Sequence, residues 1–123
     1  MRKQLSIAVF SFFYGIAGLM HFINPDIYLE VIPDYLGDAS LLNTLAGIAE
    51  LVIAICIWFN PLRNYAVYGT ILMLIAFIPA HVYFIQIGSC AGDLCIPEWI
   101  GWLRLIIIHP LLMFWAWTLR LKN

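Results

Sequence analysis

Among the ionisable residues that interrupt the long apolar stretches of this 123-residue chain are Glu50, Arg104, His81 and His21. Each one lies in a different stretch. A charged side chain within a bilayer-length apolar stretch is costly, so it should face the protein interior and have a partner. We therefore expect Glu50 to pair with Arg104, and the two histidines to extend this pair into a site that binds a ligand or carries protons. The alternative is a purely structural ion pair.

The predicted depths of these residues favour a shared site. At about 1.5 Å per helical residue, His21 lies roughly 3 Å from the outer helix ends, His81 and Arg104 roughly 9 Å, and Glu50 roughly 15 Å. All four residues then lie in the outer half of the predicted helix bundle, around a pocket that opens toward the outer face of the membrane. His109 lies about 140° around its helix from Arg104, and we expect it to bond a neighbouring group instead.

These side chains belong to a chain that is 64% hydrophobic and 11% charged, with a mean hydropathy of +0.95. Soluble domains contain about 25% charged residues, so the composition indicates an all-α membrane protein. We predict one domain, residues 1–123, forming a four-transmembrane-helix bundle with spans at 5–23, 40–59, 64–87 and 98–120. We do not interpret the basic start as a signal peptide, because its apolar run is long and has no cleavage motif. A net charge of −1 does not indicate the basic surface that nucleic-acid binding requires.

Helical periodicity predicts which faces point inward. Tyr14, Gly18 and His21 share one face of the first span. The second span has a stripe of small and polar residues, which are Asn43, Ala46, Gly47, Glu50 and Ala54. Small residues let helices approach closely, so we expect this stripe to line the bundle interior.

Local signals predict how the helices begin and bend. Ser40 is expected to cap the second span and Asn24 to cap a short interfacial helix. Residues Ile27, Tyr28, Val31 and Ile32 of that helix are expected to face the membrane. Pro79 should kink the third span.

The basic residues predict the orientation. Arg2, Lys3, Arg63, Arg120 and Lys122 all fall on one side of the four-span model, and the acidic and cysteine-containing loops fall on the other. By the positive-inside rule, both termini are cytoplasmic in a multi-pass protein of the cell membrane, which we expect to be the bacterial inner membrane.

The loop with Cys90 and Cys95 then faces an oxidising compartment, where such a pair forms a disulfide. The pair is either a structural staple or a dithiol that exchanges with another protein or a quinone. We expect Cys56 to be a small core residue. The sequence has no zinc-ligand spacing and Arg104 would repel a cation, so no metal site is predicted. A haem held by His21 and His81 is a weak alternative.

The run AGLMHFINPDIYLEVIPDYL, followed by LAGIAELVIAI, resembles the DoxX-like family of small bacterial membrane proteins. The matching features are Ala17-Gly18, His21-Phe22, Pro25, Tyr28, Pro33, Gly47 and Glu50. The family is similar to MauE-type and DoxD-type proteins, some of which are associated with disulfide formation or quinone-linked sulfur oxidation. The resemblance implies a four-helix membrane bundle and a redox association, and it leaves open whether the chain is an enzyme.

Three hypotheses follow. The first is a redox-associated protein of the lipid bilayer whose outer-half pocket binds a quinone-like or other small apolar molecule. The second is a non-enzymatic membrane subunit or assembly factor, and the third is a small weak-acid transporter. A redox protein partner or a second copy of the chain is compatible with these hypotheses.

Overall fold

The structure is a computed structural model and describes residues 1–122. Its elements in order are α1 (Arg2–Ile23), α2 (Asp26–Leu29), η1 (Asp34–Leu36), α3 (Ala39–Cys56), α4 (Asn60–Gln86), β1 (Cys90–Ala91), β2 (Leu94–Cys95), α5 (Glu98–Leu103), η2 (Arg104–Ile108) and α6 (His109–Leu119). The elements α5, η2 and α6 form one continuous helix. Together with α1, α3 and α4, it gives four helices that are long and apolar enough to cross a membrane.

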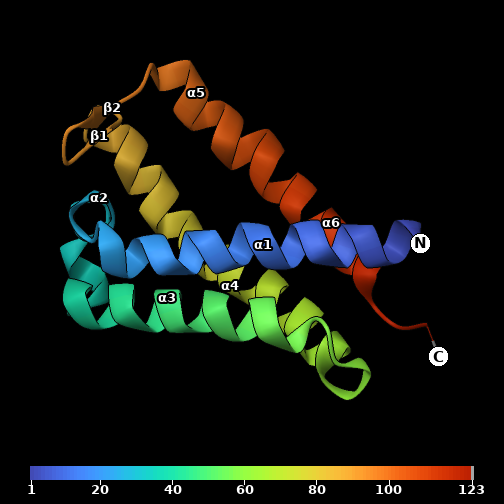
Figure 1. The fold of residues 1–123 in the computed structure, drawn as a ribbon. Coiled ribbons are helices and arrows are strands. Elements are labelled where there is room, and N and C mark those ends of the chain that lie inside the picture. The colour runs from blue at the N-terminus through green and yellow to red at the C-terminus, as the bar shows by residue number, and fades with distance from the viewer. Residues whose placement is uncertain (123) are drawn as a thin grey trace.

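The four long helices run back and forth between two ends of the molecule (Figure 1). One end holds both termini and the turn between α3 and α4, and the other holds α2, η1 and the small hairpin. Leu121 ties the first of these ends together, because its N–H donates to Asn64 Oδ1 over 2.7 Å. The five basic residues expected on one side of the bundle therefore belong to segments that meet at this end.

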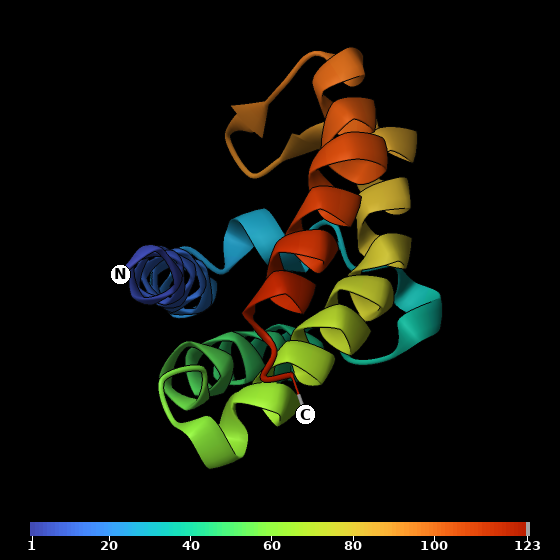
Figure 2. The ribbon, with the colours of Figure 1, turned by 90° about the vertical axis from the view of Figure 1, so that its right-hand side faces the viewer.

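The helices pack as two pairs that diverge. Helix α1 lies along α3, and α4 lies along the fourth helix, as Figures 1 and 2 show from two directions. Helices α1 and α6 meet near the end with the termini, where Trp115 donates to Ser6 Oγ over 2.8 Å and packs edge-on against Phe10. Toward the other end, α5 moves away from α1 (Figure 1).

The close approach of α1 and α3 depends on two glycines. A Cβ added at Gly18 would lie 2.9 Å from the carbonyl oxygen of Gly47 and 3.1 Å from Glu50 Cβ. A Cβ added at Gly47 would lie 2.8 Å from His21 Cβ and 2.7 Å from the Phe22 ring. The predicted inward faces are thus confirmed at this contact, because Tyr14, Gly18 and His21 are buried on α1 and Asn43, Gly47, Glu50 and Ala54 on α3.

Several helix boundaries differ from the prediction. The side chain of Asp38 caps α3 by accepting from the Leu41 N–H, so the expected cap by Ser40 is wrong. Asn24 closes the end of α1 and does not cap α2 through its side chain. Pro79 lies inside α4, which continues through it to Gln86.

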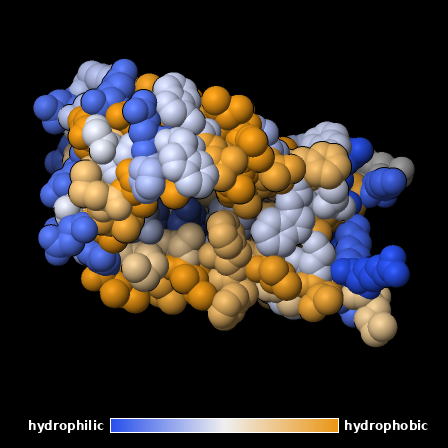
Figure 3. Space-filling model, turned by 90° about the horizontal axis from the view of Figure 1, so that it is seen from above, coloured by the Kyte–Doolittle hydropathy of each residue, from blue (hydrophilic) through white to orange (hydrophobic). Residues whose placement is uncertain are grey.

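The distribution of buried and exposed side chains is the one expected of a membrane protein. Phe10, Tyr14, Ile57, Val67 and Leu119 are among the fully buried side chains, and the half-buried Cys56 packs against this core as predicted. Many large apolar side chains on all four long helices are exposed. Figure 3 shows an apolar band between two hydrophilic ends.

Replacing Gly47 should test the contact between α1 and α3. The Gly47→Ala variant forces a methyl group against His21 and Phe22, and we expect it to lose about 1–3 kcal/mol of stability. Gly69→Ala is the matched control, because the added methyl meets no atom within 4 Å and alanine favours a helix by about 1 kcal/mol. Thermal unfolding of both variants in detergent measures the difference. Equal behaviour of the two variants would contradict the proposed role of Gly47.

Candidate functional site

A buried polar relay joins α1 to α3. His21 Nδ1 lies 2.7 Å from Asn43 Oδ1, and Asn43 Nδ2 donates back to the His21 carbonyl oxygen over 2.9 Å. On the other side of the imidazole ring, His21 Nε2 lies 3.4 Å from Glu50 Oε2. All three residues are buried, with 5–6% of their surface exposed. The predicted burial of Glu50 with a partner is correct, but that partner is His21.

The hydrogen bonds of this relay define where a proton can move. Asn43 uses its amide nitrogen to donate to the His21 carbonyl, so its oxygen faces Nδ1 as an acceptor. His21 Nδ1 therefore carries a hydrogen and donates it. The Nε2 atom faces Glu50 Oε2, so a proton placed between these two atoms would join the imidazole to the carboxyl group.

Tyr28 of α2 covers this relay. Its ring stacks on the His21 imidazole with the ring centroids 3.8 Å apart. Burial raises the pKa of the Tyr28 hydroxyl and Glu50 raises it further, against the opposing effect of Arg104. The hydroxyl therefore remains a hydrogen-bond donor at neutral pH. This placement corrects the expectation that Tyr28 faces the membrane.

The buried hydroxyl of Tyr14 has no hydrogen-bond partner among the described residues. Glu50 Oε2 has no partner there besides its 3.4 Å contact with His21 Nε2. Tyr14 is only 1% exposed. Buried polar atoms almost always have a partner, so the unpartnered Tyr14 hydroxyl is a candidate to bond a polar group of a ligand. Figure 3 shows a hollow with strongly hydrophilic atoms at its floor, between the α1 side of the molecule and the side of α5 and α6.

The predicted ion pair between Glu50 and Arg104 is not formed. The one ion pair found within residues 1–122 is that of Glu50 with His21. Arg104 is an exposed residue of the fourth helix, and its guanidinium carbon lies 5.4 Å from the centre of the Phe84 ring. The prediction failed because it measured depth from the helix ends. His21 actually packs against Gly47, two turns into α3, where Glu50 is within reach.

His81 belongs to a second group of polar residues, on α4 and the fourth helix. Its ring packs edge-on against that of His109, with the ring centroids 4.8 Å apart. His109 bonds the Leu74 carbonyl oxygen through Nε2, which confirms the expectation that it bonds a neighbouring group. The four predicted site residues therefore divide into His21 with Glu50 and His81 near Arg104. Among the described residues, no group of three potential metal ligands is close enough to hold a metal ion.

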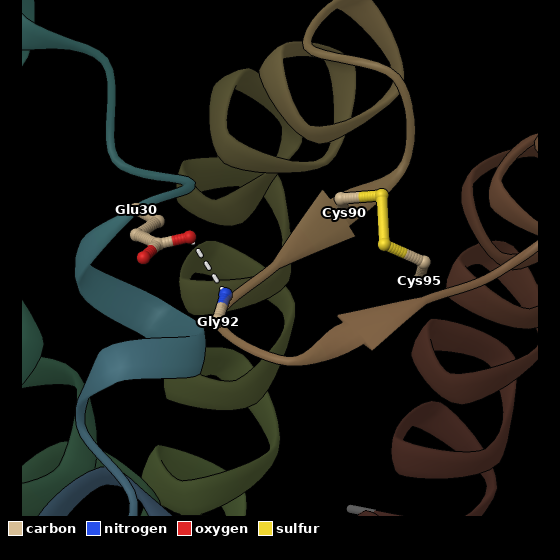
Figure 4. Close-up of a disulfide and its surroundings, with 4 residues drawn as sticks. All are labelled: Glu30, Cys90, Gly92 and Cys95. Carbon is tan, nitrogen blue, oxygen red and sulfur yellow. Dashed lines mark hydrogen bonds between the residues drawn. A yellow bond between two sulfur atoms is a disulfide. The ribbon is translucent and has the colours of Figure 1, made fainter.

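Cys90 and Cys95 form a disulfide, as predicted, and the loop that contains them folds into a hairpin. The two cysteines lie directly opposite each other in β1 and β2. At the tip, the Gly92 N–H donates to Glu30 Oε2 over 2.6 Å (Figure 4). Glu30 is two residues after Tyr28, so the hairpin holds the segment that covers the relay.

Two surface hollows lie elsewhere. A hollow of about 530 Å³ separates α2 from the hairpin tip and is lined by Asn24, Asp26, Ile27, Glu30, Gly92, Asp93 and Leu94. A second hollow of about 270 Å³ lies between α3 and α4 and is lined mainly by apolar groups, with Cys56 among them. Neither is lined by the four predicted site residues.

Together, the fold and the relay define a small helical protein with four helices suited to a membrane and a buried contact of a histidine with a glutamate between two of them. The chain belongs to the family described as domain of unknown function DUF8561, whose model matches residues 10–120. No curated protein and no solved structure matches the chain.

Sequence reasoning missed two contacts at this site, the bond of Asn43 to His21 and the stacking of Tyr28 on the His21 ring. Asn43 was on the predicted inward stripe, and its spacing of seven residues from Glu50 placed both on one face, but nothing indicated that it would bond His21. Tyr28 gave no signal of its own, because the turn at Asn24 and Pro25 decides which way its ring points.

A double-mutant cycle should show that Glu50 interacts with His21. We expect Glu50→Gln and His21→Phe to have a coupling energy of roughly 1–3 kcal/mol, because each variant removes the same contact. Phenylalanine keeps an aromatic ring against Tyr28. In the control cycle, Glu50→Gln and Arg104→Met should add to within about 0.5 kcal/mol. Thermal unfolding in detergent gives all six stabilities, and a larger coupling to Arg104 than to His21 would contradict the structure.

Proposed function

We propose that this chain is a redox-associated, four-span membrane protein that binds a quinone-like molecule beside the relay of Asn43, His21 and Glu50. The observation that carries this proposal is the buried contact of His21 with Glu50, together with the buried, unpartnered hydroxyl of Tyr14 on the same face of α1. The resemblance to the DoxX-like family is in keeping with it.

Membrane insertion is supported by the apolar surface of the four long helices, because soluble proteins rarely expose so large an apolar area to water. The orientation we propose has both termini in the cytoplasm, because the basic residues gather at that end. Asp26, Glu30, Asp34, Asp38, Asp93 and Glu98 belong to the segments at the other end. The bacterial inner membrane is the location in which the hairpin disulfide would then face an oxidising compartment.

A quinone fits the chemistry of the relay. Its ring is apolar and can lie between α1 and the diverging fourth helix. Its two oxygen atoms accept hydrogen bonds, which the Tyr14 hydroxyl and a protonated Glu50 or His21 can supply. If a redox protein partner supplies two electrons, each quinone oxygen takes up one proton to give the quinol, and the carboxyl and imidazole groups can pass on one of these two protons.

Accessibility labelling should establish the topology. In a Cys56→Ser background, a cysteine introduced at Asp34 should react with a membrane-impermeant maleimide added to intact cells, because the α2–α3 segment is expected outside. Cysteine at Lys122 is the control and should react only after the membrane is opened. The native disulfide keeps Cys90 and Cys95 out of the reaction. Labelling of the Asp34 position only after lysis would reverse the proposed orientation.

Quinone binding should depend on the relay. We expect purified protein to bind decylubiquinone in detergent, with at least a tenfold loss of affinity in Glu50→Gln and in His21→Phe. Arg63→Gln is the control, because Arg63 bonds the Ile57 carbonyl at the opposite end of the bundle. Quenching of tryptophan fluorescence and thermal shift measure binding. Unchanged affinity in both relay variants would exclude this site and leave the structural membrane subunit as the better hypothesis.

A further inference from the structure

A continuous series of contacts joins the disulfide-linked hairpin to the relay. At the hairpin tip, a Cβ added to Gly92 would lie 3.8 Å from the backbone nitrogen of Ile27 on α2. The Gly92 N–H also donates to Glu30 Oε2 over 2.6 Å, as Figure 4 shows. These two contacts lie on either side of Tyr28 in the sequence, and the Tyr28 ring stacks on His21. The hairpin therefore holds the residue that covers the relay.

The position of the hairpin tip depends on the disulfide. The two strands have two residues each, and a hairpin of this size is only marginally stable by itself. Ala91 is the buried residue of these strands and contributes a single methyl group. The disulfide joins Cys90 to Cys95, and beside it the Ile96 N–H donates to the Ser89 carbonyl over 3.0 Å. Of these constraints, only the disulfide is covalent.

The disulfide is accessible to a reducing partner. Cys95 is exposed and Cys90 is half-buried, so an incoming thiolate reaches the Cys95 sulfur first. The thiolate bonds to this sulfur, the disulfide breaks, and Cys90 leaves as a thiolate. A second thiol of the same partner then attacks the mixed disulfide and releases Cys95. Two electrons and two protons pass from the partner's dithiol to the two cysteines, and the partner keeps a disulfide.

The segment that the hairpin holds has little other support. Helix α2 is a single turn of four residues, and none of them is buried. Segments with few buried contacts open locally at a low free-energy cost. The His21 ring beneath it is 6% exposed and is bonded to α3 through Asn43, so it stays in place when α2 moves. Loss of the hairpin contacts would therefore uncover His21 without unfolding the bundle.

We propose that the Cys90–Cys95 disulfide is a redox-sensitive latch on the relay, which the dithiol of a protein partner opens. While the disulfide is intact, the hairpin holds α2 and Tyr28 stays over His21. After reduction, the strands separate, the hairpin tip releases Glu30, and α2 moves away from the relay. The inference rests on the proposed function for the ligand that then gains access, but the opening itself does not require quinone binding.

Chemical modification of histidine tests the latch in the absence of any ligand. Purified protein with Cys56→Ser, in which only the two disulfide cysteines remain, is reduced with dithiothreitol or left oxidised. The reductant is removed under argon, and diethyl pyrocarbonate is added. Peptide mass spectrometry measures the modification of His21 and the state of the disulfide. We expect reduction to raise the modification rate of His21 at least about fivefold, because the covering segment opens.

His109 is the internal control for this measurement. It is 4% exposed, as buried as His21, and it lies between α4 and the fourth helix, away from the hairpin. Its modification rate should not change on reduction. A reduced disulfide with unchanged reactivity of His21, or an equal rise at both histidines, would overturn the proposal.

Two variants locate the latch in the hairpin contacts. The double variant Cys90→Ser and Cys95→Ser should show rapid modification of His21 with or without dithiothreitol. Glu30→Ala should raise the rate in the oxidised protein, because it removes the bond to the hairpin tip and leaves the disulfide intact. Asp34→Ala, at an exposed carboxylate nearby, is the matched control and should behave as the parent protein.

The proposal remains testable if the double cysteine variant does not fold. The comparison of oxidised with reduced protein and the comparison of Glu30→Ala with Asp34→Ala then decide. Equal rates in these two alanine variants would contradict the role of the hairpin contact. Because no quinone is present in any of these measurements, failure of the latch is distinguishable from failure of the proposed quinone site.

Discussion

The close contact of α1 with α3 at Gly18 and Gly47 is the constraint on which the polar centre depends. Only glycine at these positions lets the helix axes come near enough for His21 to reach Glu50. A buried carboxyl group without a partner would be strongly destabilising, so the contact and the relay require each other. Larger residues would separate the helices and leave both ionisable groups without compensation.

This constraint also explains the shape of the bundle. Because α1 is held along α3, it meets the fourth helix only where Trp115 packs on Phe10 and bonds Ser6. The other end of the bundle is left open between α1 and α5 and is covered by α2 and the disulfide-linked hairpin. The relay and Tyr28 therefore lie toward the end of the bundle at which α1 and the fourth helix diverge.

The sequence was sufficient to predict the four long helices, their inward faces and the disulfide, because apolar length and helical period determine them. It was not sufficient to identify the partner of Glu50, because that partner depends on how far α3 is shifted along its axis relative to α1. Equal depth from the helix ends favoured Arg104, whereas α3 begins beyond the level of His21 and brings Glu50 beside it. The position of Tyr28 depends on a turn at Asn24 and Pro25, which periodicity does not describe.

The fourth helix departs from the regular geometry that the prediction assumed for Arg104 and His109. A regular helix would separate them by about 140°, but the His109 N–H bonds the Arg104 carbonyl, five residues back, through a π-helical segment. Pro110 follows directly and has no N–H to continue the regular pattern, so it gives this widening a local cause. The wider turn brings His109 against His81 on α4 while Arg104 rests on Phe84, also on α4. The π-helical segment thus lets the helix keep a buried histidine bonded to backbone and, about one turn away, an exposed arginine that rests on Phe84.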